Sequence, residues 1–245
     1  MTIILMALAV LPPILVLVYF IKKDKFREPT KYILATFFFG WAIIIPVLIF
    51  AFLMQSIFAG IREPLAAGFV SAFFGAGIPE ELFKLLVLVW YAMRRPAFDE
   101  AMDGIVYGVT VSLGFATFEN IMYVLQHGFE VALLRAFTAI PMHGFAGCIM
   151  GFYVGMAWLM PQKRGRFLFL AFLVPMLLHG AYDWPILYTE LAQSQAGQDA
   201  GGGALVALMV ALAILATEIV WARRLHKRLI RAQERRAAAA AVTPG

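Results

Sequence analysis

Seven apolar stretches, each long enough to cross a bilayer as a helix, constrain this sequence more than any other feature. They cover Ile3–Ile21, Tyr32–Met54, Ala66–Met93, Ala101–Leu125, Val131–Met160, Phe167–Tyr188 and Ala204–Ala222. A helix needs about 20 residues to span the hydrocarbon core. Only 14% of the 245 residues are charged and 62% are hydrophobic, whereas soluble domains carry about 25% charged residues. The sequence therefore predicts an all-α, polytopic membrane protein with about seven transmembrane helices.

Basic residues occur in every second connection between these stretches. They lie at Lys22–Lys31, Arg94–Arg95, Lys163–Arg166 and Arg223–Arg236, while the three alternate connections together hold one arginine, Arg62. Basic residues near the ends of spans mark the cytoplasmic side of a membrane. We therefore expect the N-terminus to lie outside and the C-terminus in the cytoplasm. The first lysines follow the first apolar stretch, which favours a retained membrane anchor over a cleaved signal peptide.

We expect residues 1–225 to form a single integral membrane domain and residues 226–245 to form a basic, Ala-rich cytoplasmic tail.

The charge distribution and the cysteine content exclude several kinds of partner and site. The net charge of +5 resides in these connections and in the tail, where topology and anionic lipid headgroups explain it. A nucleic-acid partner is therefore not expected. The single cysteine, Cys148, excludes an intramolecular disulfide and a cysteine-based zinc site.

Ionisable side chains within the third to sixth stretches are the strongest functional signal. They are Glu80, Glu81, Lys84, Glu119, His143, His179 and Asp183. Each such residue costs at least ~2.5–3.5 kcal/mol in a transmembrane helix, so its presence requires a reason. The helical rise of 1.5 Å per residue places the carboxylates and histidines roughly 8–21 Å below the outer helix ends. We therefore predict one polar cluster between the outer boundary and the middle of the bilayer.

Spacing indicates which of these side chains share a helix face. Glu80 and Lys84 are four residues apart, as are His179 and Asp183, while Glu81 lies three residues from Lys84. Residues three or four apart are neighbours on a helix surface. Prolines flank the polar positions at Pro79, Pro141, Pro175 and Pro185. Proline bends or breaks a helix, so we expect the long third and fifth stretches to be tilted, or broken at Pro79 and Pro141.

Some buried charges also have a purely structural interpretation. Lys84 is more simply a structural partner of the two glutamates than a catalytic group. Glu218 lies near Arg223 and Arg224, so its side chain can extend toward the membrane boundary. Asp103 lies near the cytoplasmic edge, where stabilisation of a helix N-terminus is the simplest role.

The polar residues also form ordered motifs, and these resemble the PrsW family of intramembrane proteases. That family is related to the type II CAAX prenyl proteases and the Abi superfamily, which includes bacteriocin-processing enzymes. The matching motifs are EExxK at Glu80–Lys84, FxxxE at Phe115–Glu119 followed by Asn120, the isolated His143, HxxxD at His179–Asp183, and the stretch Asp103–Gly108. They occur in the family's order on separate predicted helices.

The resemblance implies an intramembrane endopeptidase in a bacterial inner membrane. It further implies cleavage near the outer membrane face of a single-span protein, in some relatives an anti-sigma factor, as a first (site-1) cut. The partners would then be membrane lipid and that substrate. The catalytic residues it implies are Glu80, Glu81, Glu119, His143, His179 and Asp183, with Lys84 and Asn120 in support.

Two mechanisms are compatible with these residues. Peptide hydrolysis needs an activated water and stabilisation of the oxyanion, and Glu80 is our candidate for the general base. His143 and His179 together with Glu119 would suit zinc, which is commonly held by three protein ligands in catalytic sites. In the alternative, no metal is bound and the histidines donate hydrogen bonds to the oxyanion. Asp183, one turn from His179, could orient that imidazole or serve as a further ligand, and the sequence leaves both mechanisms open.

Other functions would use the same side chains differently. A proton-coupled transporter also buries Glu, His, Asp and Lys in the membrane, but usually carries more spans and internal repeats. A non-catalytic scaffold would not require the complete polar set. The sequence contains no HExxH, GxSG or GxGD motif, which excludes the metalloprotease, serine and aspartyl chemistries that depend on those motifs.

Overall fold

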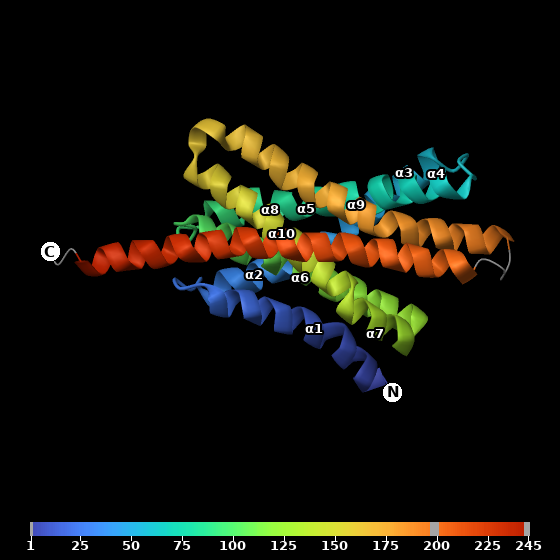
Figure 1. The fold of residues 1–245 in the computed structure, drawn as a ribbon, viewed down its shortest axis with the longest axis horizontal. Coiled ribbons are helices and arrows are strands. Elements are labelled where there is room, and N and C mark those ends of the chain that lie inside the picture. The colour runs from blue at the N-terminus through green and yellow to red at the C-terminus, as the bar shows by residue number, and fades with distance from the viewer. Residues whose placement is uncertain (1, 197–200, 243–245) are drawn as a thin grey trace.

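The computed structural model describes residues 2–196 and 201–242, and all regular elements in these ranges are helical. The helices form one elongated bundle (Figure 1). They are α1 (Thr2–Lys23), α2 (Thr30–Ala42), α3 (Ile44–Ile57), α4 (Pro64–Val70), η1 (Ser71–Gly77), α5 (Ile78–Trp90), η2 (Ala92–Arg94), α6 (Ala101–His127), α7 (Phe129–Phe137), α8 (Ala139–Leu159), η3 (Pro161–Lys163), α9 (Arg164–Ala196) and α10 (Gly201–Val242). The predicted all-α architecture is confirmed.

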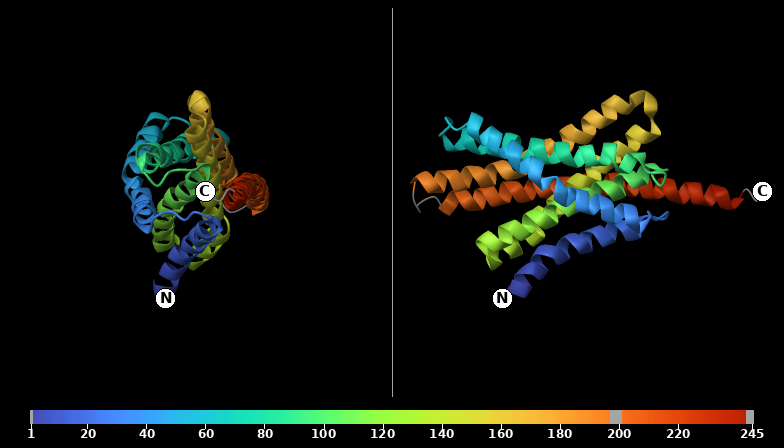
Figure 2. Two further views of the ribbon diagram at one scale, coloured as in Figure 1. Left: turned by 90° about the vertical axis from the view of Figure 1, so that its left-hand side faces the viewer. Right: turned by 180° about the vertical axis from the view of Figure 1, so that it is seen from behind.

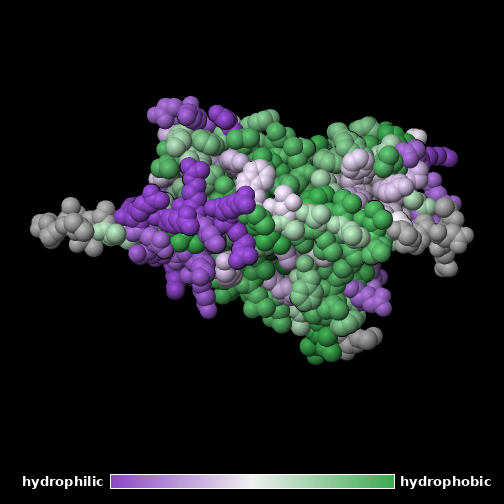
Figure 3. All heavy atoms as spheres, in the orientation of Figure 1, coloured by the Kyte–Doolittle hydropathy of each residue, from purple (hydrophilic) through white to green (hydrophobic). Residues whose placement is uncertain are grey.

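Six helical runs in the described residues are long and apolar enough to cross a membrane. The third predicted stretch is not one of these six runs. It is divided among α4, the π-helix η1 and α5, which follow one another without a gap. The basic connections α1–α2 and α8–α9 lie at the same end of the bundle as the C-terminal part of α10 (Figure 1). Hydrophilic residues gather at the two ends of the molecule, with an apolar surface between them (Figure 3). This distribution suits a protein that spans a bilayer.

Prolines account for three interruptions of the helical runs. The α2–α3 junction at Ile43 precedes Pro46 by three residues, and the α7–α8 junction at Thr138 precedes Pro141 by three. Pro79 comes two residues after the π-helix ends. Proline lacks the N–H that would bond to the carbonyl four residues earlier, and its ring clashes with that carbonyl. The fifth predicted stretch is therefore broken just before its proline, and the third is locally widened rather than cut.

Helix α6 lies in the middle of the bundle (Figure 2) and is buried along most of its length. It packs most extensively against α8. Glycines make this close packing possible: Gly104 and Gly108 of α6 face Gly147, Gly151 and Gly155 of α8, backbone against backbone. Small residues of this kind allow transmembrane helices to approach closely, where dispersion and weak interactions hold them together.

We predict that Gly151→Ala destabilises the protein by about 1–3 kcal/mol, the usual cost of overpacking. A β-carbon at this position would overlap the carbonyl of Gly104, and a backbone atom cannot move aside as a flexible side chain can. Thermal unfolding of the purified protein in detergent measures the effect. The matched control is Gly165→Ala in α9, where an added β-carbon meets no atom within 4 Å. Equal melting temperatures for the two variants would contradict this account of the α6–α8 interface.

Candidate active site

The seven ionisable side chains predicted from the sequence lie in one connected cluster. They come from four helices: three from the start of α5, one each from α6 and α8, and two from α9. Each is within 4.0 Å of another member through an ion pair or a hydrogen bond. The sequence therefore located the cluster correctly, while the catalytic role of each residue stays a prediction.

Lys84 lies at the centre of this cluster. Its Nζ is 3.2 Å from Glu80 Oε2, 2.8 Å from Glu81 Oε1 and 3.2 Å from His143 Nδ1. It also lies 4.5 Å from the centre of the Phe115 ring, a cation–π distance. Lys84 has no exposed surface, so these neighbours replace all of its hydration. A buried charge is tolerated when it is paired and hydrogen-bonded, and Lys84 meets both conditions.

His179 joins the α5 carboxylates to α9. Its Nδ1 is 2.8 Å from Glu81 Oε1, and its Nε2 is 3.2 Å from Asp183 Oδ2 and 3.9 Å from Glu80 Oε2. The ring lies 5.1 Å from that of His143 and nearly perpendicular to it. Both histidines are almost completely buried. Asp183, one helical turn away, is positioned to orient the His179 imidazole, as expected from the spacing.

Glu119 is held by a residue that the sequence analysis missed. Arg135 of α7 places Nη2 at 2.7 Å from Glu119 Oε2 and donates from Nε to Asn120 Oδ1 at 3.0 Å. Asn120 in turn donates to the carbonyl of Ala9 in α1. His143 Nε2 lies 3.0 Å from the same Glu119 oxygen. The signal was available, because Arg135 is an arginine inside the fifth apolar stretch.

The structure corrects the interpretation of Glu218. Rather than extending to the membrane boundary, its side chain is fully buried in α10. Neither carboxylate oxygen has a hydrogen-bond partner among the described residues. A buried carboxyl group without a hydrogen-bond partner is costly in an apolar interior, and nearness in sequence to Arg223 and Arg224 does not relieve that cost.

One end of the cluster reaches the surface. The side chains of Glu119 and Asp183 are 19% and 23% exposed, while those of Lys84, Glu81 and His179 are at most 2% exposed. The predicted depths place these same two carboxylates nearest the outer face. The exposed end of the cluster is therefore the end that the loop charges assign to the outside.

Four side chains of the cluster have the chemistry and spacing of a metal site. Glu80, Glu81, His143 and His179 each offer one ligand atom, and these atoms lie within 4.8 Å of one another. Glu81 Oε2 is buried and has no hydrogen-bond partner among the described residues. Imidazole nitrogen and carboxylate oxygen suit zinc. The set shares both histidines with the predicted one but contains the α5 glutamates where Glu119 was expected. A metal ion held there would require the Lys84 ammonium to move aside.

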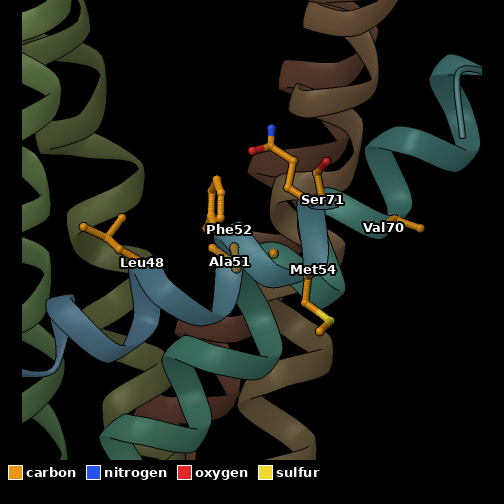
Figure 4. A pocket seen from close by; sticks show the side chains of 9 residues that line it. Leu48, Ala51, Phe52, Met54, Val70 and Ser71 are labelled. Atoms are coloured by element: carbon orange, nitrogen blue, oxygen red, sulfur yellow. The ribbon is translucent and has the colours of Figure 1, made fainter. Parts of the chain in front are cut away.

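An apolar groove lies apart from these charges, between α3 and η1 (Figure 4). Its volume is about 400 Å³, and Leu48, Phe52 and Met54 of α3 face Val70 and Ser71 across it. None of the seven ionisable residues lines it. The groove is thus a feature of the bundle's apolar surface rather than part of the charged cluster.

Comparison with known proteins identifies the enzyme class. Residues 28–221 match the family described as "PrsW family intramembrane metalloprotease". The chain belongs to the PrsW family. Proteins named Protease PrsW are similar over most of their length. This chain is 39% identical to Protease PrsW of Geobacillus kaustophilus over 187 residues, which cover 76% of this chain and 81% of that protein.

Further members of the family support the same assignment. Protease PrsW of Bacillus subtilis is 40% identical over 71% of this chain and 78% of its own, and that of Clostridioides difficile is 33% identical over 75% and 79%. No solved structure shows a significant match. This PrsW-family protein is therefore a multi-pass membrane protein and an intramembrane protease, that is, a peptide hydrolase. The alternative of a proton-coupled transporter is not supported.

We predict that Arg135→Met destabilises the folded protein by about 3–5 kcal/mol, because it leaves the Glu119 charge in the bundle without its strongest partner. The double variant Glu119→Gln, Arg135→Met removes both charges and should recover most of the lost stability. Thermal unfolding in detergent compares the stability of the wild type, the two single variants and the double variant. Arg62→Met, at an exposed loop position, is the control. Losses that simply add in the double variant would show that the two side chains do not act as a pair.

Proposed function

We propose that the protein cuts single-span membrane proteins at a peptide bond near the outer face of the membrane, with Glu80 as the general base. The observation that carries this proposal is the convergence of two carboxylates and two histidines from α5, α8 and α9 within 4.8 Å. Hydrolysis of an amide requires a base for water, a stabiliser for the oxyanion and an acid for the leaving amine. This cluster contains side chains suited to each task.

The contacts of the two α5 glutamates favour different roles for them. Glu81 has no exposed surface, and one oxygen is 2.8 Å from both Lys84 and His179. It is well placed to fix the orientation of His179. Glu80 makes the longer contacts, 3.2 Å to Lys84 and 3.9 Å to His179, and its side chain is 8% exposed. Glu80 is therefore freer to accept a proton from a water molecule that enters from the open end.

His143 comes from α8 and His179 from α9, and their rings lie 5.1 Å apart. Both can therefore act on the same substrate carbonyl. We propose that they also hold a zinc ion together with a carboxylate from the cluster, which agrees with the family's description as metalloproteases. Such an ion would supply Lewis-acid polarisation of the carbonyl and the attacking water. Lys84 would then neutralise the carboxylates that are not ligands, and Asp183 would hold the His179 ring in place.

Position and family membership support a proposal for the substrate and the membrane. Because the open end of the cluster carries Glu119 and Asp183, the scissile bond would reach the site from the predicted outer side. We propose a single-span protein of the anti-sigma-factor type, cut once at this position, in a bacterial inner membrane. The division into a membrane domain over residues 1–225 and a cytoplasmic tail over 226–245 stays a prediction.

The general-base role predicts that Glu80→Gln abolishes cleavage while the protein still folds. The amide keeps the size of the side chain but cannot take up a proton. Membrane proteomics of cells that express the wild type or the variant should reveal one or a few single-span proteins that accumulate uncut in the variant. The control is Glu130→Gln at an exposed position of α7, which should leave cleavage unchanged. Continued cleavage by a folded Glu80→Gln protein would reject this residue as the base.

The metal proposal predicts stoichiometric zinc in protein purified in detergent. It also predicts loss of this zinc in a His143→Ala, His179→Ala double variant. Elemental analysis measures the metal, and thermal unfolding shows whether the variant is folded. A strong chelator should also abolish cleavage of the substrate, and added zinc should restore it. Full activity of metal-free protein would favour the glutamate mechanism, in which the histidines act only as hydrogen-bond donors.

A further inference from the structure

A second group of buried carboxylates lies far from the proposed active site, at the end of the bundle that carries the basic connections. Asp24 and Glu28 belong to the α1–α2 connection, and Asp103 lies in the first turn of α6. One carboxylate oxygen of each lies within 4.8 Å of those of the other two. Asp103 is fully buried, Asp24 is 4% exposed and Glu28 is partly buried. Like charges this close repel strongly in a poorly hydrated environment.

Asp103 uses only half of its carboxylate as a helix cap. Its Oδ2 accepts hydrogen bonds from the backbone N–H groups of Asp99 and Glu100, at 2.7 and 2.8 Å. This confirms the helix N-terminal role expected from the sequence. Its Oδ1 is buried and has no hydrogen-bond partner among the described residues. Capping alone therefore does not account for the second oxygen.

The other two carboxylates show the same partial use. Asp24 Oδ1 accepts from Gln233 Nε2 of α10 at 2.8 Å and from the backbone of Phe26 at 3.1 Å, while the buried Oδ2 has no partner among the described residues. Glu28 accepts a hydrogen bond from the hydroxyl of Tyr107, one turn along α6 from Asp103. Two oxygens in this small volume thus lack a donor.

Protein cations do not neutralise these charges. Within the described residues, no lysine or arginine nitrogen lies within 4.0 Å of Asp24, Glu28 or Asp103. Arg236, at 63% side-chain exposure, pairs instead with Glu100 at 3.4 Å. Burial raises the pKa of Glu28 to about 7 and also raises the pKa of Asp24. Both shifts have the direction expected for carboxylates whose burial outweighs the favourable interactions around them, including that of Asp24 with Arg27.

We propose that Asp24, Glu28 and Asp103 form a binding site for a hard divalent cation, Mg²⁺ or Ca²⁺. All three residues offer carboxylate oxygens, the ligands that these ions prefer, and water molecules would complete the coordination. A pocket of about 370 Å³, lined in part by Glu100, Gln233 and Arg236, lies beside the Gln233 side chain that donates to Asp24. The site is separate from the Glu/His cluster and does not depend on the proposed catalytic roles.

The bound ion would tie three parts of the chain together. Asp24 and Glu28 bring the α1–α2 connection, Asp103 brings the start of the central helix α6, and Gln233 links Asp24 to α10. Gln233 Oε1 also accepts from the backbone of Lys25 at 3.4 Å. The ion would thus stabilise the end of the bundle where α1, α6 and α10 meet.

Thermal unfolding of the full-length protein in detergent tests this proposal. Addition of MgCl₂ or CaCl₂ should raise the melting temperature of the wild type by several degrees, because an ion that binds only the folded state stabilises it. Choline chloride at equal ionic strength should not. In Glu28→Gln and Asp24→Asn the apparent affinity for the cation should fall on the order of tenfold or more, as for other damaged metal sites. Glu234→Gln, an exposed α10 position beside Gln233, should respond like the wild type.

Direct binding provides a second readout: competition by Ca²⁺ or Mg²⁺ in the wild-type protein needs no variant, and variants are compared once a cooperative melting transition shows that they are folded. Terbium luminescence, sensitised by the nearby Tyr107, should appear with the wild-type protein and should decrease on addition of Ca²⁺ or Mg²⁺. The signal should persist in Glu81→Gln, because that carboxylate belongs to the other cluster, and should be lost in Glu28→Gln. A wild-type melting temperature that neither Mg²⁺ nor Ca²⁺ raises, or a terbium signal that is unchanged in a folded Glu28→Gln protein, would overturn the proposal and indicate that a proton neutralises these carboxylates instead.

Discussion

The pairing of Lys84 with the two α5 glutamates is the interaction on which the polar cluster depends. In a membrane helix, an isolated carboxylate or ammonium group is costly, and several like charges in one place are costlier still. A single ammonium group between Glu80, Glu81 and His143 makes the arrangement tolerable, because every α5 charge then has a partner within 3.2 Å. Arg135 does the same for Glu119 from the other side. The cluster is thus two cations among four carboxylates and two histidines.

The geometry of the cluster depends on how closely the helices approach. Glycines let α6 and α8 meet backbone to backbone, which fixes the distance between Glu119 on one helix and His143 on the other. Near the α5 glutamates, Gly77 of η1 lies against the backbone of α9, and Gly180 of α9 leaves room for the Phe73 ring of η1. Bulkier residues at these points would separate the helices by more than the reach of a hydrogen bond. The apolar packing of the helices therefore determines the geometry of the polar cluster.

Much of this arrangement is predictable from the sequence, because hydropathy and helical spacing are local properties. The apolar stretches predict the helices, and the i, i+4 pairs predict that Lys84 meets Glu80 and that His179 meets Asp183. What spacing does not contain is contact between helices. It does not reveal that His143 meets Lys84, that His179 meets Glu81 rather than Glu119, or that Arg135 reaches across from α7. The buried Glu218 was misjudged for the same reason, since proximity in sequence to Arg223 says nothing about which way α10 faces.

The π-helix η1 sets the direction in which α5 as a whole presents its side chains, relative to α4 before it. A π-helical turn holds more residues than an α-helical one, so it changes the direction in which all following side chains point. Here η1 ends immediately before Ile78, whose N–H bonds to the carbonyl of Phe73, five residues earlier. The widened turn leaves space for the Pro79 ring, which would otherwise meet the carbonyl of Gly75. Within α5, Glu80 and Glu81 lie four and three residues before Lys84, so both carboxylates reach its ammonium group by regular helical spacing. The irregular backbone before α5 therefore acts on the helix as a whole: it sets where this group of three charges points, while the α-helical spacing holds the three together.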